Sequence, residues 1–116
     1  MQFAKKSISL IIMSILLTFM LTACVPSTVE DAKTKMESAD FYVKEYIPDN
    51  TDKEYGVIDG FYANNKTDSM LALYFEDSKT AKEYAKDWVD SKYQVIGSAG
   101  NWAYAGTKGA IKAFKS

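Results

Sequence analysis

Cys24 is the only cysteine of the chain, and its thiol is the side chain whose chemistry is easiest to define. A thiolate can act as a nucleophile, a metal ligand or half of a disulfide, but a single cysteine cannot form a disulfide within its own chain. The chain contains no histidine and no arginine. The commonest general base and metal ligand is therefore missing, as is the side chain that binds phosphate or carboxylate groups through paired hydrogen bonds. We expect a non-enzymatic protein with no catalytic residue, metal or cofactor.

The residues before Cys24 have the pattern of an export signal. Lys5 and Lys6 provide a positive start, and the following residues, 7–23, carry no charge and are mostly Ile, Leu, Met and Phe. As a helix this run would be about 26 Å long, the short limit for crossing the hydrocarbon core of a membrane. It ends in Leu21-Thr22-Ala23-Cys24, which resembles the lipobox of bacterial lipoprotein signal peptides.

The resemblance implies a lipid anchor on Cys24. In that family the cysteine thiol receives diacylglycerol, and a peptidase that recognises the positions of Leu21, Thr22 and Ala23 cuts before the cysteine. Residues 1–23 would then be a signal peptide, and a lipoprotein carrying acyl chains such as palmitate would sit at the extracytoplasmic face of the cell membrane, at the cell surface. Two acyl chains anchor stably where one does not. The competing interpretation is a buried thiol at the end of a retained membrane helix.

The 93 residues that follow Ala23 are enough for one small domain with a single core. Residues 24–27 form a short tether, about 14 Å if fully extended to residue 28, so the domain is expected to lie close to the bilayer. Fourteen of the sixteen aromatic residues come after Cys24, as do twelve lysines and all fifteen acids. The lysines are scattered, and this argues against a nucleic-acid partner.

The spacing of apolar residues predicts an α+β fold for the single domain, residues 28–116. Steps of three and four predict helices over 28–39, over 79–91 with Trp88 and Val89 on the apolar stripe, and after Thr107. Strands are predicted over 41–47, 55–63, 69–75, 93–96 and 101–105. The order α-β-β-β-α-β-β-α, with short turns, indicates a small antiparallel sheet of about 4–5 strands with helices packed on one face, preceded by the hydrophobic signal helix.

Four segments that loosely match binding motifs are better explained as turns. Residues 49–56 resemble a calcium loop, but Lys53 occupies a position that requires an oxygen ligand. Asn65-Lys66-Thr67 has the spacing of a glycosylation acceptor, which asparagine-rich turn chemistry also explains. The glycine-rich segments 97–100 and 106–109 lack the spacing of a phosphate-binding loop.

Asn101, Trp102 and Tyr104 are the candidate binding residues, because they share one late strand and the two aromatic residues point to the same face. Exposed aromatic rings beside an amide can stack on sugars or anchor a protein partner. The competing interpretation places both rings in the core beneath the helix over 79–91. Tyr42 and Tyr46 share a face in the same way.

Three functions are compatible with these features. A surface module that binds a protein, a peptide or a wall glycan would need an exposed aromatic patch, and the sequence favours this function. A structural or accessory lipoprotein without a ligand is the first alternative. A small enzyme that uses carboxylates and lysines is the second, and it would require a pocket with perturbed acids.

Overall fold

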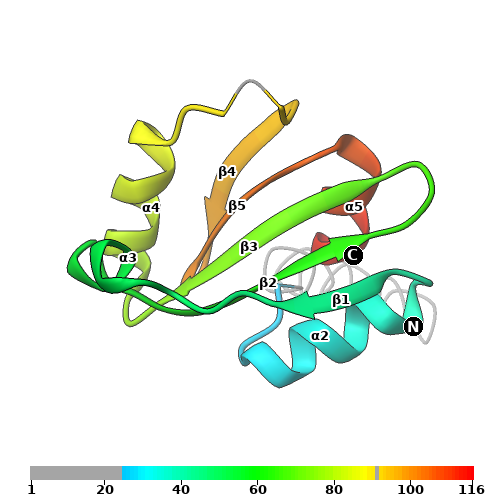
Figure 1. Ribbon diagram of the computed structural model, residues 1–116, viewed down its shortest axis with the longest axis horizontal. Coiled ribbons are helices and arrows are strands. Elements are labelled where there is room, and N and C mark those ends of the chain that lie inside the picture. Colours follow the sequence, from blue (N-terminus) through cyan, green and yellow to red (C-terminus); the bar gives the residue numbers. More distant parts are fainter. Residues whose placement is uncertain (1–24, 91) are drawn as a thin grey trace, which may run out of the picture.

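Strands of alternating side chains build a five-stranded antiparallel sheet in the computed structural model, which describes residues 25–90 and 92–116 (Figure 1). The strands are β1 (Tyr42–Glu45), β2 (Val57–Asn64), β3 (Ser69–Phe75), β4 (Val95–Ala99) and β5 (Trp102–Gly106). Their order across the sheet is β1-β2-β3-β5-β4, so β3 lies at the centre and β1 and β4 form the edges. The α+β class and the antiparallel pairing agree with the sequence prediction.

Four helices surround this sheet in the described part of the chain: α2 (Val29–Ser38), α3 (Asn50–Glu54), α4 (Ser78–Asp87) and α5 (Lys108–Lys115). Short polar side chains begin three of them. The side chain of Thr28 accepts a hydrogen bond from the backbone N–H of Asp31, and that of Asp77 accepts one from Thr80. Such caps satisfy backbone donors that the first turn leaves without partners, and they set where each helix starts.

The helices cover both faces of the sheet, so the prediction that they pack on one face is wrong. On one face α2 and α5 enclose a core that includes Phe61, Trp102 and Phe114. On the other face α4 covers Leu73 and Phe75, and Figure 1 shows α4 and α5 on opposite sides of the strands. The physical reason is that the two side-chain rows of β3 are both apolar, and each row must be shielded from water.

The order of elements differs from the prediction by one helix. The composition of residues 48–52 predicts a turn, yet the short helix α3 begins at Asn50. A capping box starts it: Asp49 accepts a hydrogen bond from the N–H of Asp52 (2.8 Å), and Asp52 accepts one from the N–H of Asp49 (3.0 Å). The two aspartates thus stabilise a helical turn where the composition alone indicated a loop.

Helix α4 is shorter than predicted. Its last residue is Asp87, and Trp88 already has an extended backbone. Val89, expected on the apolar stripe, is 92% exposed. The chain therefore leaves the helix early, and Trp88 and Val89 extend along the surface beside α4.

The predicted signal helix, the recognition residues Leu21, Thr22 and Ala23, and the lipid attachment site Cys24 lie outside the described residues. Within the part that the structure describes, no helix combines the length and apolar character needed to span a membrane.

Candidate functional site

Trp102 and Tyr104 do not form an exposed binding surface, and this prediction from the sequence is wrong. Their side chains are only 1% and 4% exposed. Both lie on β5, which has a neighbouring strand on each side, and Phe114 of α5 packs on their rings with centroid distances of 5.3 and 5.9 Å. The competing interpretation, burial in the core, is confirmed, but the covering helices are α2 and α5 rather than α4.

The polar atoms of this region hold neighbouring segments of the chain in place. The indole N–H of Trp102 donates to the main-chain oxygen of Pro26 at 2.7 Å, and the hydroxyl of Tyr74 donates to that of Ser27 at 3.0 Å. The side-chain amide of Asn101 donates to the main-chain oxygen of Glu76. The segment that directly follows Cys24 is therefore attached to the α2 and α5 side of the sheet.

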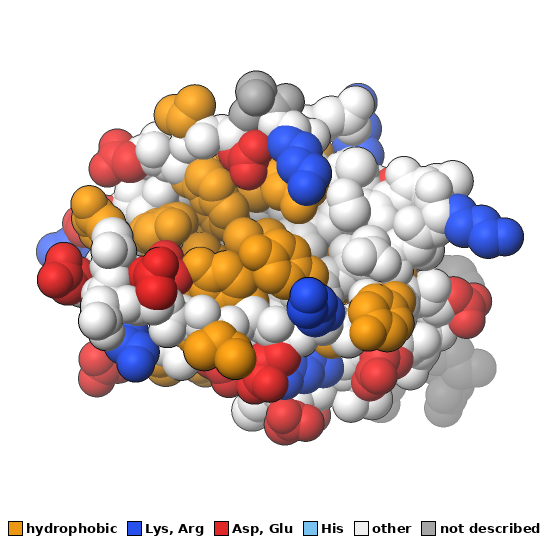
Figure 2. All heavy atoms as spheres, in the orientation of Figure 1, with side chains coloured by type: hydrophobic (Ala, Val, Ile, Leu, Met, Phe, Trp, Pro, Cys, Tyr) orange, Lys and Arg blue, Asp and Glu red, His pale blue; other side chains and the backbone are white. Residues whose placement is uncertain are grey.

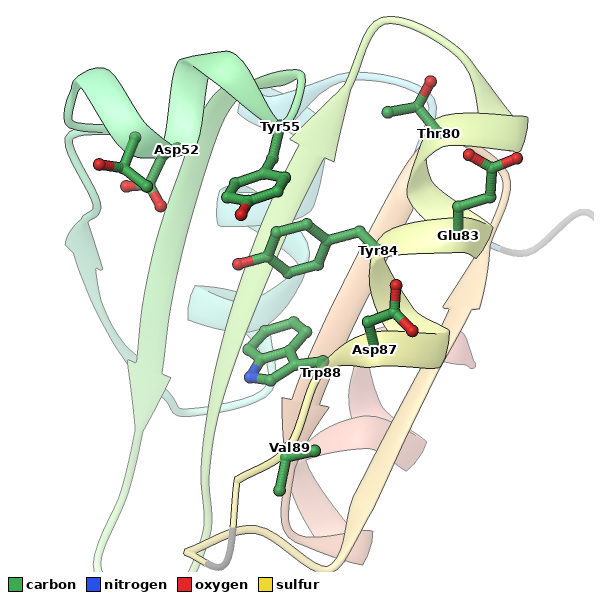
Figure 3. Close-up of a pocket in the computed structure, with 9 residues that line it drawn as sticks. Asp52, Tyr55, Thr80, Glu83, Tyr84, Asp87, Trp88 and Val89 are labelled. Atoms are coloured by element: carbon green, nitrogen blue, oxygen red, sulfur yellow. The ribbon is translucent and has the colours of Figure 1, made fainter.

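A surface groove lies between α3 and α4, on the opposite side of the sheet (Figure 3). We call it the α3–α4 groove, and its volume is about 530 Å³. Figure 2 shows hydrophobic side chains gathered at the centre of the face that these helices border, with both acidic side chains and lysines around the margin. The residues that line the groove are Thr51, Asp52, Tyr55, Thr80, Glu83, Tyr84, Asp87, Trp88 and Val89.

Three aromatic rings form the wall of the groove. Tyr84 lies between Tyr55 and Trp88 (Figure 3), with centroid distances of 6.2 and 5.4 Å and interplanar angles of 75° and 80°. Edge-to-face pairs of this kind are favoured by the ring quadrupoles. Tyr84 also rests on the buried ring of Phe75, at 5.2 Å. The wall is thus continuous with the core beneath α4.

Tyr46 connects α3 to the sheet. Its hydroxyl donates to Oδ2 of Asp52 at 2.5 Å, and its ring packs edge-on against Tyr62 at 5.6 Å. Burial, together with this hydrogen bond to a carboxylate, raises the pKa of Tyr46 well above its usual value. Burial and the negative charge of Asp52 also raise the pKa of Tyr84. Both tyrosine hydroxyls therefore keep their proton at neutral pH.

Gly56 allows α3 and α4 to approach each other. Its φ angle is +92°, and a Cβ atom at this position would lie 2.8 Å from the side-chain methyl of Thr80. Any other residue would be strained in this conformation and would push against α4. A glycine at the end of α3 thus determines how close Tyr55 comes to Tyr84.

All charged residues that line the groove are acidic: Asp52, Glu83 and Asp87. None of the three forms an ion pair with a lysine in the described part of the chain. Within residues 25–90 and 92–116, no three acidic side chains come close enough together to hold a metal ion. The carboxylates are therefore spread along the two rims of an aromatic groove, Asp52 on the α3 side and the other two on α4.

The groove could not be recognised from one motif, because its residues come from two helices and the segments that follow them. The sequence places Asp52 in a predicted turn, Tyr55 in a predicted strand, and Tyr84 and Trp88 on a helix stripe expected to be buried. The capping-box spacing of Asp49 and Asp52 was the one available signal for α3. Comparisons with models of protein families, with curated proteins and with solved structures find no match to the chain.

Proposed function

We propose that this chain is an extracytoplasmic lipoprotein whose domain is a non-enzymatic binding module, with the α3–α4 groove as its binding site. The observation that carries the proposal is the groove itself, about 530 Å³ in volume and walled by the rings of Tyr55, Tyr84 and Trp88. Ligand sites are typically concave, mostly apolar and aromatic, with a few polar groups that orient the ligand. The groove has this composition. We therefore propose it as the binding site instead of the region around Trp102, which the sequence suggested.

The chemistry of the groove supports binding rather than catalysis. Apart from the polar groups on the aromatic rings, its polar side chains are two threonines and three carboxylates, without a lysine among them. A nucleophilic threonine would need a general base that is itself held by a third group, and no hydrogen bond joins Thr51 or Thr80 to a groove carboxylate through their side chains within the described residues. These residues can contribute to the affinity for a ligand and can orient it in the groove.

The position of residues 24–27, the tether, supports a function close to a membrane surface. Pro26 and Ser27 accept hydrogen bonds from Trp102 and Tyr74 on the α2 and α5 side of the sheet. With a lipid on Cys24, two residues earlier than Pro26, this attachment leaves little free chain between the anchor and the domain. The groove lies on the other side of the sheet, so a ligand can reach it from outside the membrane.

The anchor is tested by metabolic labelling with a fatty-acid analogue, comparing the native chain with Cys24→Ala. We expect label on the native protein alone, together with release of the variant from the membrane fraction. Equal labelling of both proteins would refute the lipid anchor and leave the groove proposal untouched.

The binding site is tested by ¹⁵N NMR on the full-length chain in a polyoxyethylene detergent, which carries neither an ammonium group nor a sugar. The probes are an N-acetylglucosamine oligomer, a mixed set of short synthetic peptides, and simple amines. Trp88 lines the groove and Trp102 is buried, so the two indole N–H signals provide a built-in comparison. We expect at least one probe to shift the Trp88 signal and leave Trp102 unchanged. If no probe moves Trp88 selectively, the groove is not a binding site and the accessory function is favoured.

A further inference from the structure

We propose that the α3–α4 groove binds an organic ammonium group, as carried by an alkylamine or a lysine side chain. This inference rests on the proposed function, because it assigns a ligand class to the same groove. Its support comes from the aromatic wall, from the charge of the rims and from the hydrogen-bonding capacity of the lining residues.

The aromatic wall is suited to a cation. A positive group is attracted to the face of an aromatic ring within about 6 Å of its centroid, and tryptophan and tyrosine are the strongest partners. Tyr55 and Trp88 stand at 75° and 80° to Tyr84, so the groove presents ring faces in more than one direction. Tyr55 is 62% exposed and accessible to a ligand.

The charge of the rims selects for the same kind of ligand. Asp52, Glu83 and Asp87 surround the rings without a counter-charge among the residues that line the groove. An anion would be repelled, and a neutral ligand could donate hydrogen bonds to the carboxylates but would lack the attraction between opposite charges.

A second hollow on the protein provides a contrast. Its volume is about 330 Å³, and its lining includes Lys44 and Lys92 together with Tyr62 and Tyr93. Aromatic residues are thus combined with negative charges in the α3–α4 groove and with positive charges in the second hollow. Of these two hollows, only the α3–α4 groove would attract a cation.

The lining residues can also accept hydrogen bonds from an ammonium group. The three carboxylates and the hydroxyls of Thr51 and Thr80 provide acceptors on both rims. A primary ammonium has three N–H donors that need such acceptors, whereas a quaternary ammonium has no N–H donor and is attracted only by the ring faces and the negative charges. We therefore expect primary amines to bind more tightly than tetramethylammonium.

The test is an NMR titration of the full-length chain with 1,5-diaminopentane, followed at the Trp88 indole signal. Phosphate buffer is used, because amine buffers would compete. The matched neutral probe is 1,5-pentanediol, which has the same chain length without charge, and tetramethylammonium separates the contribution of the rings from that of the hydrogen bonds. We expect saturable binding of the diamine, weaker binding of tetramethylammonium, no binding of the diol, and loss of affinity as salt is raised.

Substitutions in the groove localise the interaction. Glu83→Gln and Asp87→Asn should each weaken diamine binding about two- to fivefold, the range for a partly exposed ion pair. Glu45→Gln, at an exposed position of β1 outside the groove, is the control and should leave binding unchanged. Trp88→Leu keeps an apolar side chain but removes the ring face, and it should weaken binding about fivefold. Because this variant lacks the Trp88 indole, its titration is followed at the backbone amide signals of Tyr55 and Tyr84, which are also recorded for the native chain.

Each result bears on the inference in a defined way. Equal binding of diamine and diol, or full affinity in Trp88→Leu, would overturn the ammonium assignment. Selective binding of the N-acetylglucosamine oligomer would do the same while supporting a binding module. If neither amine shifts the Trp88 signal, the inference is wrong, and the response of that signal to the other probes decides the proposed function separately.

Discussion

Replacing Trp102 by phenylalanine should destabilise the domain and release the segment that connects it to Cys24. The indole ring is 1% exposed and packs against Phe61, Tyr74 and Phe114 at centroid distances of 5.8, 4.8 and 5.3 Å. Its N–H donates to the main-chain oxygen of Pro26 at 2.7 Å. The Trp102→Phe variant keeps an aromatic ring in the core but loses this hydrogen bond and part of the packed volume.

The size of the effect follows from these two losses. A hydrogen bond between neutral groups contributes about 1 kcal/mol, and leaving the Pro26 oxygen without its partner adds to this cost. The smaller ring leaves a void, and the removal of a few buried atoms costs about 1–2 kcal/mol. We expect the free energy of unfolding to fall by about 2–3 kcal/mol, which lowers the Tm of a domain of this size by about 10–20 °C.

The assay is urea unfolding followed by circular dichroism, since fluorescence would be altered by the loss of a tryptophan. Tyr74→Phe is the matched control, because it removes only the hydrogen bond to Ser27 and should cost about 0.5–1 kcal/mol. Limited proteolysis should cleave between Val25 and Val29 faster in Trp102→Phe than in the native chain. A loss of stability no larger than that of Tyr74→Phe, with unchanged proteolysis, would refute the structural role assigned to the indole N–H.

Three further predictions concern the groove and the helices that border it. Gly100 has a φ of +55° and open space around it, so Gly100→Ala should lower the free energy of unfolding by about 1–2 kcal/mol. Gly56→Ala should lower it by at least about 1 kcal/mol more, because its Cβ would also press on Thr80. Equal urea midpoints for the two variants would contradict the close approach of α3 and α4. The backbone N–H of Thr80 lowers the pKa of Asp77 below its usual 3.8. The charge of Asp77 therefore stabilises the fold above pH 3.8, and this contribution is lost as the pH falls through the lower pKa of the folded state. In a plot of Tm against pH, Asp77→Asn should decline less steeply than the native chain on the acid side, and an equal decline would argue against the cap. Burial and the hydrogen bond to Asp52 raise the pKa of Tyr46 above 10.0. The contribution of the Tyr46 hydroxyl to stability is therefore complete below that pH and is lost as the pH rises above it. Tyr46→Phe should be less stable than the native chain at neutral pH but lose less of its Tm between about pH 9 and about pH 11, and parallel Tm profiles of the two proteins would exclude a stabilising role of the hydroxyl.

Much of the fold could be predicted because it depends on local patterns. The alternation of Leu71, Leu73 and Phe75 with Met70 and Ala72 predicts β3 with the bounds it has. The spacing of apolar residues indicates the secondary structure of a segment directly, because side chains return to the same face every two residues in a strand and every 3.6 residues in a helix.

Gly60 shows that a local signal can also indicate a contact. A glycine inside a strand pattern predicts a bulge or a close approach of another part of the backbone. In the structure a Cβ at Gly60 would lie 2.7 Å from the main-chain oxygen of Ala72, next to a register shift in β2.

The candidate site could not be predicted in the same way, because exposure is decided by what packs on each face. Trp102 is covered by Phe114 of α5, whereas Trp88 lies beyond the end of α4 beside the groove. The same residue type at two positions therefore has opposite surroundings. No local pattern distinguishes the two, since both belong to apolar stripes.

The sequence by itself determined the α+β class, most of the strands and the resemblance of residues 21–24 to a lipobox, because each depends on residues that are close together in the chain. Only the tertiary structure decided that helices cover both faces, that Trp102 holds Pro26, and that Tyr55, Tyr84 and Trp88 form one wall. These features join residues that are distant in sequence, and their geometry depends on how the sheet and helices pack against each other.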